Sequence, residues 1–382
     1  MHFPDSKLPQ VGTTIFSVMS QLANDAGAIN LSQGFPDFDG PEYLRKRVAH
    51  YIENGANQYA PMTGIPALRT AIADKVERIY GRVTCAESEV TVTSGATEAL
   101  FAAIAAVVQT GDEVIVFDPA YDSYEPAIQL NGGKAIHLAL NPPTFSIDWS
   151  ALKEAINPRT RMIVINSPHN PTGAVLRADD LEQLAEIVRD TDILILSDEV
   201  YEHISFDGLP HQSVLRHPEL SARSFVVSSF GKTYHTTGWK VGYCIAPAVL
   251  STELRKVHQY LTFSTVTPVQ LALADMMNEM PEHYEELPAF YQQKRDMFCQ
   301  LMEGSRFSCV KTSGTYFQLM DYSAISDLPD TEFCRWLIEE AGVAAIPISV
   351  FSEAPMETRL VRFCFAKSDD TLRAAAEKLC KI

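Results

Sequence analysis

Six short apolar runs with little polar alternation most constrain the fold that this chain can adopt. They are Glu89–Thr93, Glu113–Phe117, Met162–Asn166, Ile193–Ser197, Phe225–Ser228 and Val241–Ala246. Strands that are covered on both faces have such nearly continuous apolar sequences. Helical spacing appears between them, from Ala96 to about Gln109 and over Asp179–Arg189. The order strand, helix, strand predicts an α/β fold with a mostly parallel central sheet and helices on both faces.

The pattern changes after about residue 275. A charged helical stretch covers residues 281–303, and two short strand-like runs follow in GTYFQLMDY and TRLVRFCFA. The 382 residues suit two or three domains at roughly 100–200 residues each. We therefore predict an N-terminal arm of residues 1–40 that packs with the small domain, a large domain of residues 41–275 and a small α+β domain of residues 276–382.

Charge and composition exclude several classes of protein. The net charge is −17 and no basic block is present, which argues against binding to nucleic acid. No apolar run approaches the roughly 20 residues that cross a bilayer, and the first residues do not resemble a secretory signal. The seven cysteines are scattered and form no C-x-x-C pair. We expect neither a disulfide framework nor a metal site, and a cytoplasmic location.

Polar residues follow five of the apolar runs, at the point where each predicted strand ends. The five segments are Ser94–Thr97, Asp118–Tyr121, Ser167–Pro171, Asp198–Tyr201 and Ser229–Lys232. Each segment alone is ordinary, because Asn-Pro marks turns and an aspartate often caps the next helix. In an open parallel sheet, however, ligands bind beside the carboxyl ends of the strands. We therefore expect these five segments to converge on one site.

The residue types at these strand ends suit one cofactor. A lysine can form an imine with an aldehyde, and an aspartate can keep a pyridine nitrogen protonated. A strand-to-helix junction such as Ser94–Thr97 favours a phosphate. An aromatic ring such as that of Tyr121 can stack on a flat cofactor. Together these groups predict a site for pyridoxal 5′-phosphate (PLP), in which the cofactor is the electron sink.

The motifs resemble those of one enzyme family over nearly the whole chain. SSFGKTYHTTGWKVGY, residues 228–243, is similar to the lysine signature of class I/II PLP-dependent aminotransferases of fold type I. SQGFPDF, NQYAP, NSPHNPTG, SDEVYEH and RFCF also match, in family order. The likeness is greatest to kynurenine and glutamine aminotransferases and bacterial methionine aminotransferases. The resemblance implies a ping-pong transfer of the amino group of an L-amino acid to a 2-oxo acid.

The resemblance also implies roles for individual residues. Lys232 holds PLP as a Schiff base and moves the proton, Asp198 pairs with the pyridine nitrogen, and Tyr201 and Asn170 bond the phenolic oxygen. The remaining cofactor contacts are stacking by Tyr121 and phosphate binding by Gly95, Ala96, Thr97, Ser229 and Lys240. Many relatives have an arginine in place of Lys240, and lysine supplies a point charge instead of a bidentate fork. Kynurenine aminotransferase-like members share the lysine.

The same resemblance implies which residues bind the substrate and which residue contacts a second subunit. Arg362 binds the substrate carboxylate, assisted by Gly34 and Asn170. Independently of the family, Arg362 lies in a run with two apolar faces, so its guanidinium should be partly buried and needs an anionic partner. Ile15 and Phe16 are expected to contact the substrate side chain, which favours methionine, aromatic or glutamine-like substrates. Tyr59 is expected to reach the phosphate of a neighbouring subunit, which implies a homodimer with shared sites.

Other interpretations of the motif around Lys232 are weaker. Ser229–Lys232 fits the S-x-x-K signature of serine hydrolases, but the later S-D-N and K-T-G motifs are missing. A P-loop would require a glycine where this chain has Val226. A carbon–sulfur β-lyase of the same fold remains an alternative, because it uses the same cofactor core. An aminotransferase-like transcription regulator would carry a further DNA-binding module.

Tyr243, at the end of the lysine signature, is expected to pack in the core and to have no role in the site.

Overall fold

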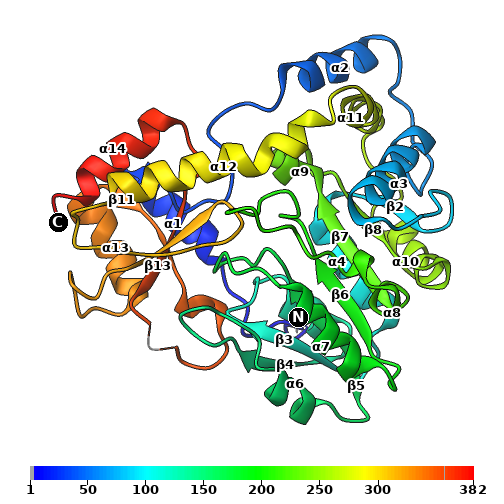
Figure 1. Cartoon of the computed structure of the whole chain (residues 1–382), viewed down its shortest axis with the longest axis horizontal. Coiled ribbons are helices and arrows are strands. Elements are labelled where there is room, and N and C mark those ends of the chain that lie inside the picture. The colour runs from blue at the N-terminus through cyan, green and yellow to red at the C-terminus, as the bar shows by residue number, and fades with distance from the viewer. Residues whose placement is uncertain (1–3, 357) are drawn as a thin grey trace.

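A seven-stranded sheet forms the centre of the larger part of the molecule (Figure 1). The structure is a computed structural model and describes residues 4–356 and 358–382. The strand order is β2-β8-β7-β6-β5-β3-β4. The strands are β2 (Val90–Thr93), β3 (Glu113–Asp118), β4 (Lys134–Ala139), β5 (Thr160–Asn166), β6 (Leu194–Asp198), β7 (Ser224–Ser229) and β8 (Gly242–Ile245). Only β8 runs antiparallel to its neighbours, so the predicted mostly parallel α/β sheet is confirmed.

Alternate residues of these strands enter two different cores, which explains their continuous apolar sequences. On β3, Val114 and Val116 face one core, while Ile115 and Phe117 face the other. The first core is covered by α4 (Gly95–Val107), α5 (Tyr124–Leu130) and α10 (Ala248–Leu261). The second is covered by α2 (Glu42–Glu53), α3 (Pro66–Tyr80), α6 (Trp149–Ala155), α7 (Ala178–Val188), α8 (Pro218–Ser221) and α11 (Thr267–Glu279).

A smaller antiparallel sheet of order β12-β13-β10-β9 lies in the C-terminal part of the chain. Its strands are β9 (Ser308–Val310), β10 (Phe317–Asp321), β12 (Ile346–Pro347) and β13 (Leu360–Cys364). The core on this sheet also receives Met19 and Ala23 of α1 (Ile15–Asp25). Helices α12 (Glu282–Leu301), α13 (Asp330–Ala341) and α14 (Asp369–Leu379) accompany the sheet, and β1 (Ile29–Asn30) pairs with β11 (Val343–Ala344). The domain limits at residues 40/41 and 275/276 stay predictions.

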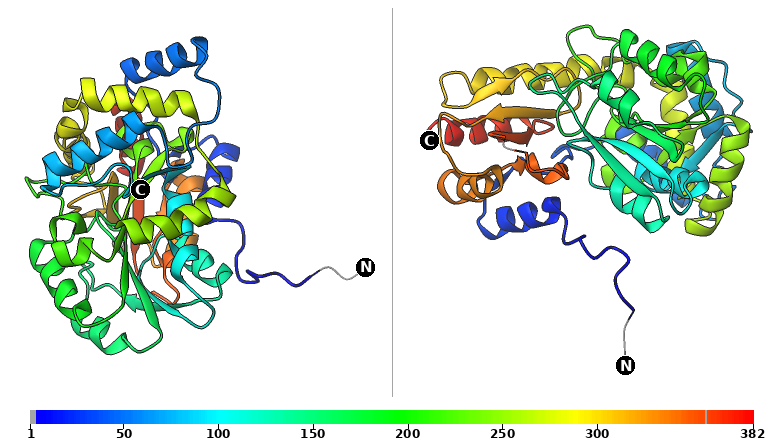
Figure 2. Two further views of the ribbon diagram at one scale, coloured as in Figure 1. Left: turned by 90° about the vertical axis from the view of Figure 1, so that its right-hand side faces the viewer. Right: turned by 90° about the horizontal axis from the view of Figure 1, so that it is seen from below.

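Two further features bear on the site. The chain ahead of α1 leads away from the body of the molecule (Figure 2), and residues 10–13 line a depression beside Tyr121. Short helical turns α9 (Phe230–Thr233), η1 (Val214–Arg216), η2 (Thr237–Trp239) and η3 (Ser349–Phe351) connect the larger elements. Within the described ranges, none of the helices is long and apolar enough to cross a membrane.

Candidate active site

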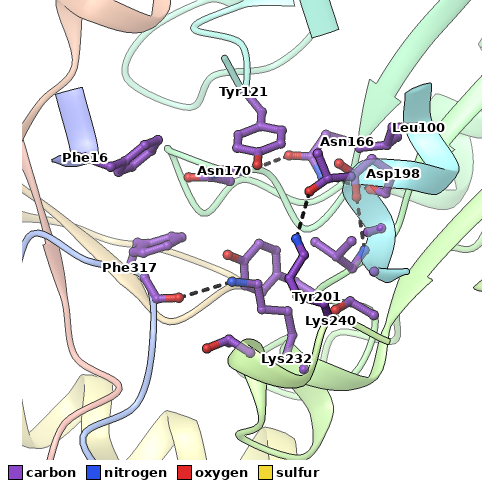
Figure 3. Close-up of a pocket in the computed structure, with 18 of the residues that line it drawn as sticks. Phe16, Leu100, Tyr121, Asn166, Asn170, Asp198, Tyr201, Lys232, Lys240 and Phe317 are labelled. Carbon is purple, nitrogen blue, oxygen red and sulfur yellow. Dashed lines mark hydrogen bonds between the residues drawn. The ribbon is translucent and has the colours of Figure 1, made fainter. Parts of the chain in front are cut away.

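A cavity of about 250 Å³ opens at the carboxyl edge of the seven-stranded sheet (Figure 3). β2 runs parallel to β7, so the ends of β2, β5, β6 and β7 all reach this edge. All predicted site residues except Ile15 and Tyr59 line it. They are Phe16, Gly34, Gly95, Ala96, Thr97, Tyr121, Asn170, Asp198, Tyr201, Ser229, Lys232, Lys240 and Arg362. The five strand-end segments therefore converge, as their sequence positions predict.

Lys232 enters the cavity from α9, immediately after β7. Its Nζ donates hydrogen bonds to the carbonyl oxygen of Gly34 at 3.1 Å and to the hydroxyl of Tyr316 at 2.9 Å. Burial lowers the pKa of Lys232 to about 8, and the positive charges of Arg362 and Lys240 act in the same direction. More of the amine is therefore neutral near pH 7 than for an ordinary lysine. A neutral amine is the form that attacks an aldehyde.

Asp198 ends β6 and is 3% exposed. Its carboxylate accepts hydrogen bonds from the Tyr124 hydroxyl at 2.7 Å and from the Val200 N–H at 3.3 Å. Burial raises the pKa of Asp198 to about 6, although both hydrogen bonds oppose that shift. A buried carboxylate without a cationic partner is costly. The surroundings of Asp198 thus suit a cationic group such as a protonated pyridine nitrogen.

The start of α4 offers a place for a phosphate. The N-cap residue Ser94 makes no side-chain hydrogen bond to the first turn of α4, and Gly95, Ala96 and Thr97 of this turn line the cavity. Lys240 Nζ lies 3.4 Å from the Thr97 hydroxyl on this turn. Gly95 has φ +75, and a Cβ there would lie 3.2 Å from Lys240 Cε. A helix N-terminus beside a cation favours an anion, so this donor set fits the phosphate of PLP.

Arg362 is the other cation of the cavity. It lies on β13 and is 0% exposed, so the predicted burial of its guanidinium is found. The guanidinium donates to the side-chain oxygen of Asn170 at 2.6 Å and to the Ser32 carbonyl at 3.0 Å, and it lies 3.8 Å from the ring centre of Phe317. Nε has no partner among the described residues. Burial lowers the pKa of Arg362 to about 10. A buried guanidinium with spare donors suits a carboxylate ligand.

The turn that carries Asp198 and Tyr201 is anchored by Glu202 on its other side. Lys75 Nζ lies 2.7 Å from the carboxylate of Glu202, and both side chains are 3% exposed. Further donors to this carboxylate are the hydroxyls of Tyr80, Ser228 and Tyr243. Burial opposes its ionisation, yet the charge of Lys75 and the hydrogen bonds from Lys75 and Ser228 hold the pKa of Glu202 well below its usual value. Tyr243 is buried as expected, but its hydroxyl belongs to this network.

Two predicted residues lie outside the cavity. Ile15 lines a neighbouring depression, and Tyr121 lines both this depression and the cavity. Tyr59 is 85% exposed and packs edge-on against Phe263, with 5.6 Å between the ring centres. No group of histidine, cysteine and acidic residues suited to a metal ion occurs in the part of the chain that the structure describes.

Other residues of the site were not predicted from the sequence. Tyr124 holds Asp198, and Asn166 donates to the Asp198 carbonyl at 2.8 Å. Asn166 ends a predicted strand, so its position could have suggested a role. Tyr316 and Phe317 contact Lys232 and Arg362, and nothing in the sequence around them indicates this.

Comparisons with known proteins agree with this geometry. The family described as "Aminotransferase class I and II" matches residues 26–379. The methionine aminotransferase of Escherichia coli is 59% identical over 98% of this chain and 97% of its own. Human kynurenine–oxoglutarate transaminase 1 is 32% identical over 94% of each chain. A crystal structure of YbdL from E. coli, reported as having a methionine aminotransferase function, superposes with a TM-score of 0.98 at 58% identity and covers 100% of both chains.

The family match spans most of the chain, and the relatives align from end to end. Members of this family depend on PLP and act on amino and 2-oxo acids. The resemblance carried by the sequence motifs is therefore confirmed: the chain belongs to the class I and II aminotransferase family and is an aminotransferase.

Proposed function

We propose that this aminotransferase uses PLP to move the amino group of L-methionine, or of an aromatic or glutamine-like L-amino acid, to a 2-oxo acid. One observation carries the proposal. A lysine with a pKa lowered to about 8 and a buried arginine with an unpartnered Nε line the same cavity of about 250 Å³. The amine suits an aldehyde, and the guanidinium suits the carboxylate of an amino acid. The likeness to E. coli methionine aminotransferase supports the choice of donor.

The cavity residues divide into groups that would hold PLP. Asp198 would keep a proton on the pyridine nitrogen, because an ion pair relieves its buried charge. Tyr201 and Asn170 would bond the phenolic oxygen, and Tyr121 would stack on the ring. The phosphate is held by Gly95, Ala96, Thr97, Ser229 and Lys240. When bound, PLP supplies an electron sink that stabilises negative charge at the substrate Cα.

Lys232 is the group that binds the cofactor and then moves the proton. Its Nζ would bind the cofactor aldehyde and, as a free amine, would accept the substrate Cα proton as a general base. The Gly34 carbonyl and the Tyr316 hydroxyl hold Nζ in the cavity. A pKa near 8 places this base close to the working pH. Because the amino group is stored between two half-reactions, the kinetics should be ping-pong.

The cavity also favours particular side chains on the substrate. Arg362, with Asn170 and Gly34, binds the α-carboxylate. Among the described residues that line the cavity, Arg362 is the only arginine, so a second carboxylate has no matching fork. Phe16 lines the same cavity and Ile15 the adjoining depression, which suits an apolar side chain.

The active form is a homodimer in this proposal, and the reaction takes place in the cytoplasm. Large apolar side chains are exposed near Tyr59: Phe263, 44% exposed, contacts its ring, and Ile52 at 49% and Val266 at 44% line a depression together with Tyr59. Such a patch is typical of a protein–protein interface, and a second copy would bring Tyr59 to the phosphate of its partner. All seven cysteines are free, which fits a reducing compartment.

The proposal is tested with Lys232→Ala, using Lys153→Ala on the exposed side of α6 as the matched control. We expect Lys232→Ala to lose the absorbance band of the lysine-bound cofactor and at least about 10⁴-fold in turnover, because it removes both the imine and the base. Lys153→Ala should retain both. An absorbance band in Lys232→Ala equal to that of the control would contradict the proposal.

A substrate screen tests the donor and the reaction type. We expect methionine and phenylalanine to be turned over faster than aspartate, and only with a 2-oxo acid present. Release of pyruvate and ammonia from a cysteine conjugate without a 2-oxo acid, as the main activity, would instead indicate the β-lyase.

A further inference from the structure

A second cavity, larger than the first, lies behind the candidate active site. Its volume is about 790 Å³, against about 250 Å³ for the cavity that holds Lys232. It is bounded by the carboxyl ends of β3 and β5, by the loops over residues 140–147 and 169–177, and by residues 309–313 beside β9. The cavity therefore lies where the seven-stranded sheet meets the small sheet. Small-molecule sites commonly have roughly 300–1,000 Å³ and occupy such junctions.

The lining of this cavity is mostly apolar and carries few charges. The apolar residues are Phe117, Leu140, Pro143, Phe145, Ile147, Val164, Ile165, Ala174, Val175, Leu176 and Val310. His169 is neutral near pH 7, because burial lowers its pKa to about 4. Lys311 is paired with Asp207 at 3.2 Å.

Arg177 is the cation that remains available at this cavity. The Asp180 carboxylate also lines the cavity, but it already accepts the backbone N–H of Arg177 at 2.7 Å and the indole N–H of Trp149 at 3.2 Å. The exposed guanidinium of Arg177 forms no salt bridge with any described residue. An apolar wall with one free guanidinium is complementary to an apolar molecule that ends in a carboxylate.

Two residues form a wall between the second cavity and the active site. Tyr124 lines the second cavity, and its hydroxyl donates to Asp198 at 2.7 Å. Asn166 lines both cavities, and its side-chain oxygen accepts the Asn170 N–H at 2.8 Å. The side chain of Asn170 in turn accepts from Arg362 at 2.6 Å. Short hydrogen-bonded paths thus lead from the second cavity to Asp198 and Arg362, two of the charged groups that the proposed reaction uses.

We propose that the second cavity binds an apolar carboxylate and that its occupancy changes the activity of the site next to it. The binding stands on the cavity alone, whereas the effect on activity rests on the proposed function. A ligand that contacts Tyr124 and Asn166 interacts with residues that hold Asp198 and Asn170, so its binding free energy depends on their arrangement. Such coupling is reciprocal, and the substrate should alter the affinity of this ligand.

The probe is 4-phenylbutanoate, which has an apolar ring and a carboxylate but neither an amino nor a 2-oxo group. Its binding to the holoenzyme is measured by calorimetry, and its effect on transamination is measured at saturating amino donor. We expect binding, and a change in rate that saturating donor does not remove. Arg177→Gln should weaken the binding about tenfold, the loss of one charge-assisted hydrogen bond. Ala174→Phe, which fills the cavity, should weaken it further.

Arg189→Gln is the matched control. Arg177 directly precedes α7 and Arg189 directly follows it, but Arg189 lies outside the cavity. The Arg189→Gln protein should bind the probe with the same affinity as the unaltered protein. The proposal is overturned if no binding is detected. It is equally overturned if binding is unaffected by Arg177→Gln and Ala174→Phe and is purely competitive with the donor, because the probe then occupies the site of Arg362. The calorimetric result holds whether or not the proposed substrates are turned over, so failure of one proposal is distinguishable from failure of the other.

Discussion

At the scale of single residues, Lys232 shows how burial prepares a side chain for chemistry. Its pKa is lowered to about 8, so roughly one amine in ten is neutral at pH 7, against roughly one in a few thousand for an ordinary lysine. We expect the rate at which the cofactor-free protein binds PLP covalently to rise with pH up to about 8 and then to level off. Stopped-flow absorbance measures this rate. A rate that climbs steadily to pH 10 would show an ordinary lysine.

The burial of Asp198 affects stability: it destabilises the folded protein when the cofactor is absent. Its folded-state pKa is raised from 3.8 to about 6, so its contribution to stability is complete below pH 4 and is lost as the pH rises to about 6. We compare the free energy of unfolding of cofactor-free Asp198→Asn with that of the unaltered protein. We expect the difference in favour of the variant to grow by about 3 kcal/mol from pH 4 to pH 7. Denaturant unfolding at both pH values measures the difference. An equal difference at the two values would contradict the raised pKa.

At the scale of elements, the turn after β6 depends on the buried pair of Lys75 and Glu202. Glu202→Gln or Lys75→Met alone leaves a buried charge without its partner and should cost about 3–5 kcal/mol of stability. The double variant should recover most of this loss, because neither charge remains. If the pair also positions Asp198 and Tyr201, both single variants should shift the pH at which the cofactor absorbance changes. Additive losses of stability in the double variant would argue against a coupled pair.

The elements also show what the sequence could and could not predict. Strands buried on both faces are found by their apolar runs, and polar strand ends such as Asp198 indicate the edge at which the cavity opens. β4 was missed because it lies at the edge of the sheet and is half exposed, so its sequence lacks such a run. Tyr316 was missed because its contact with Lys232 depends on how two sheets pack, over 84 residues of separation. Local patterns carry no information about such distant packing.

At the scale of the whole molecule, the proposed homodimer would cover the exposed apolar surface near Tyr59 with a second copy of the chain. We expect the protein to sediment as a dimer, and Phe263→Asp to produce monomers with little activity, because each site then lacks the neighbouring Tyr59. Tyr59→Phe should remain dimeric and bind PLP about tenfold more weakly, through the loss of one hydrogen bond to a charged group. Sedimentation and cofactor titration measure the two effects. A fully active monomer would rule out the shared site.

The placement of Arg362 on the small sheet has a consequence for how a substrate is measured. Lys232 lies on α9 directly after β7, and Asp198 ends β6 of the seven-stranded sheet, whereas Arg362 lies on β13 of the small sheet. The distance between the groups proposed to bind the substrate carboxylate and to form the imine therefore depends on how the two sheets pack against each other. In the proposed function, a substitution at the junction of the two sheets would change this distance, and with it the substrate preference, without altering any residue that lines the cavity.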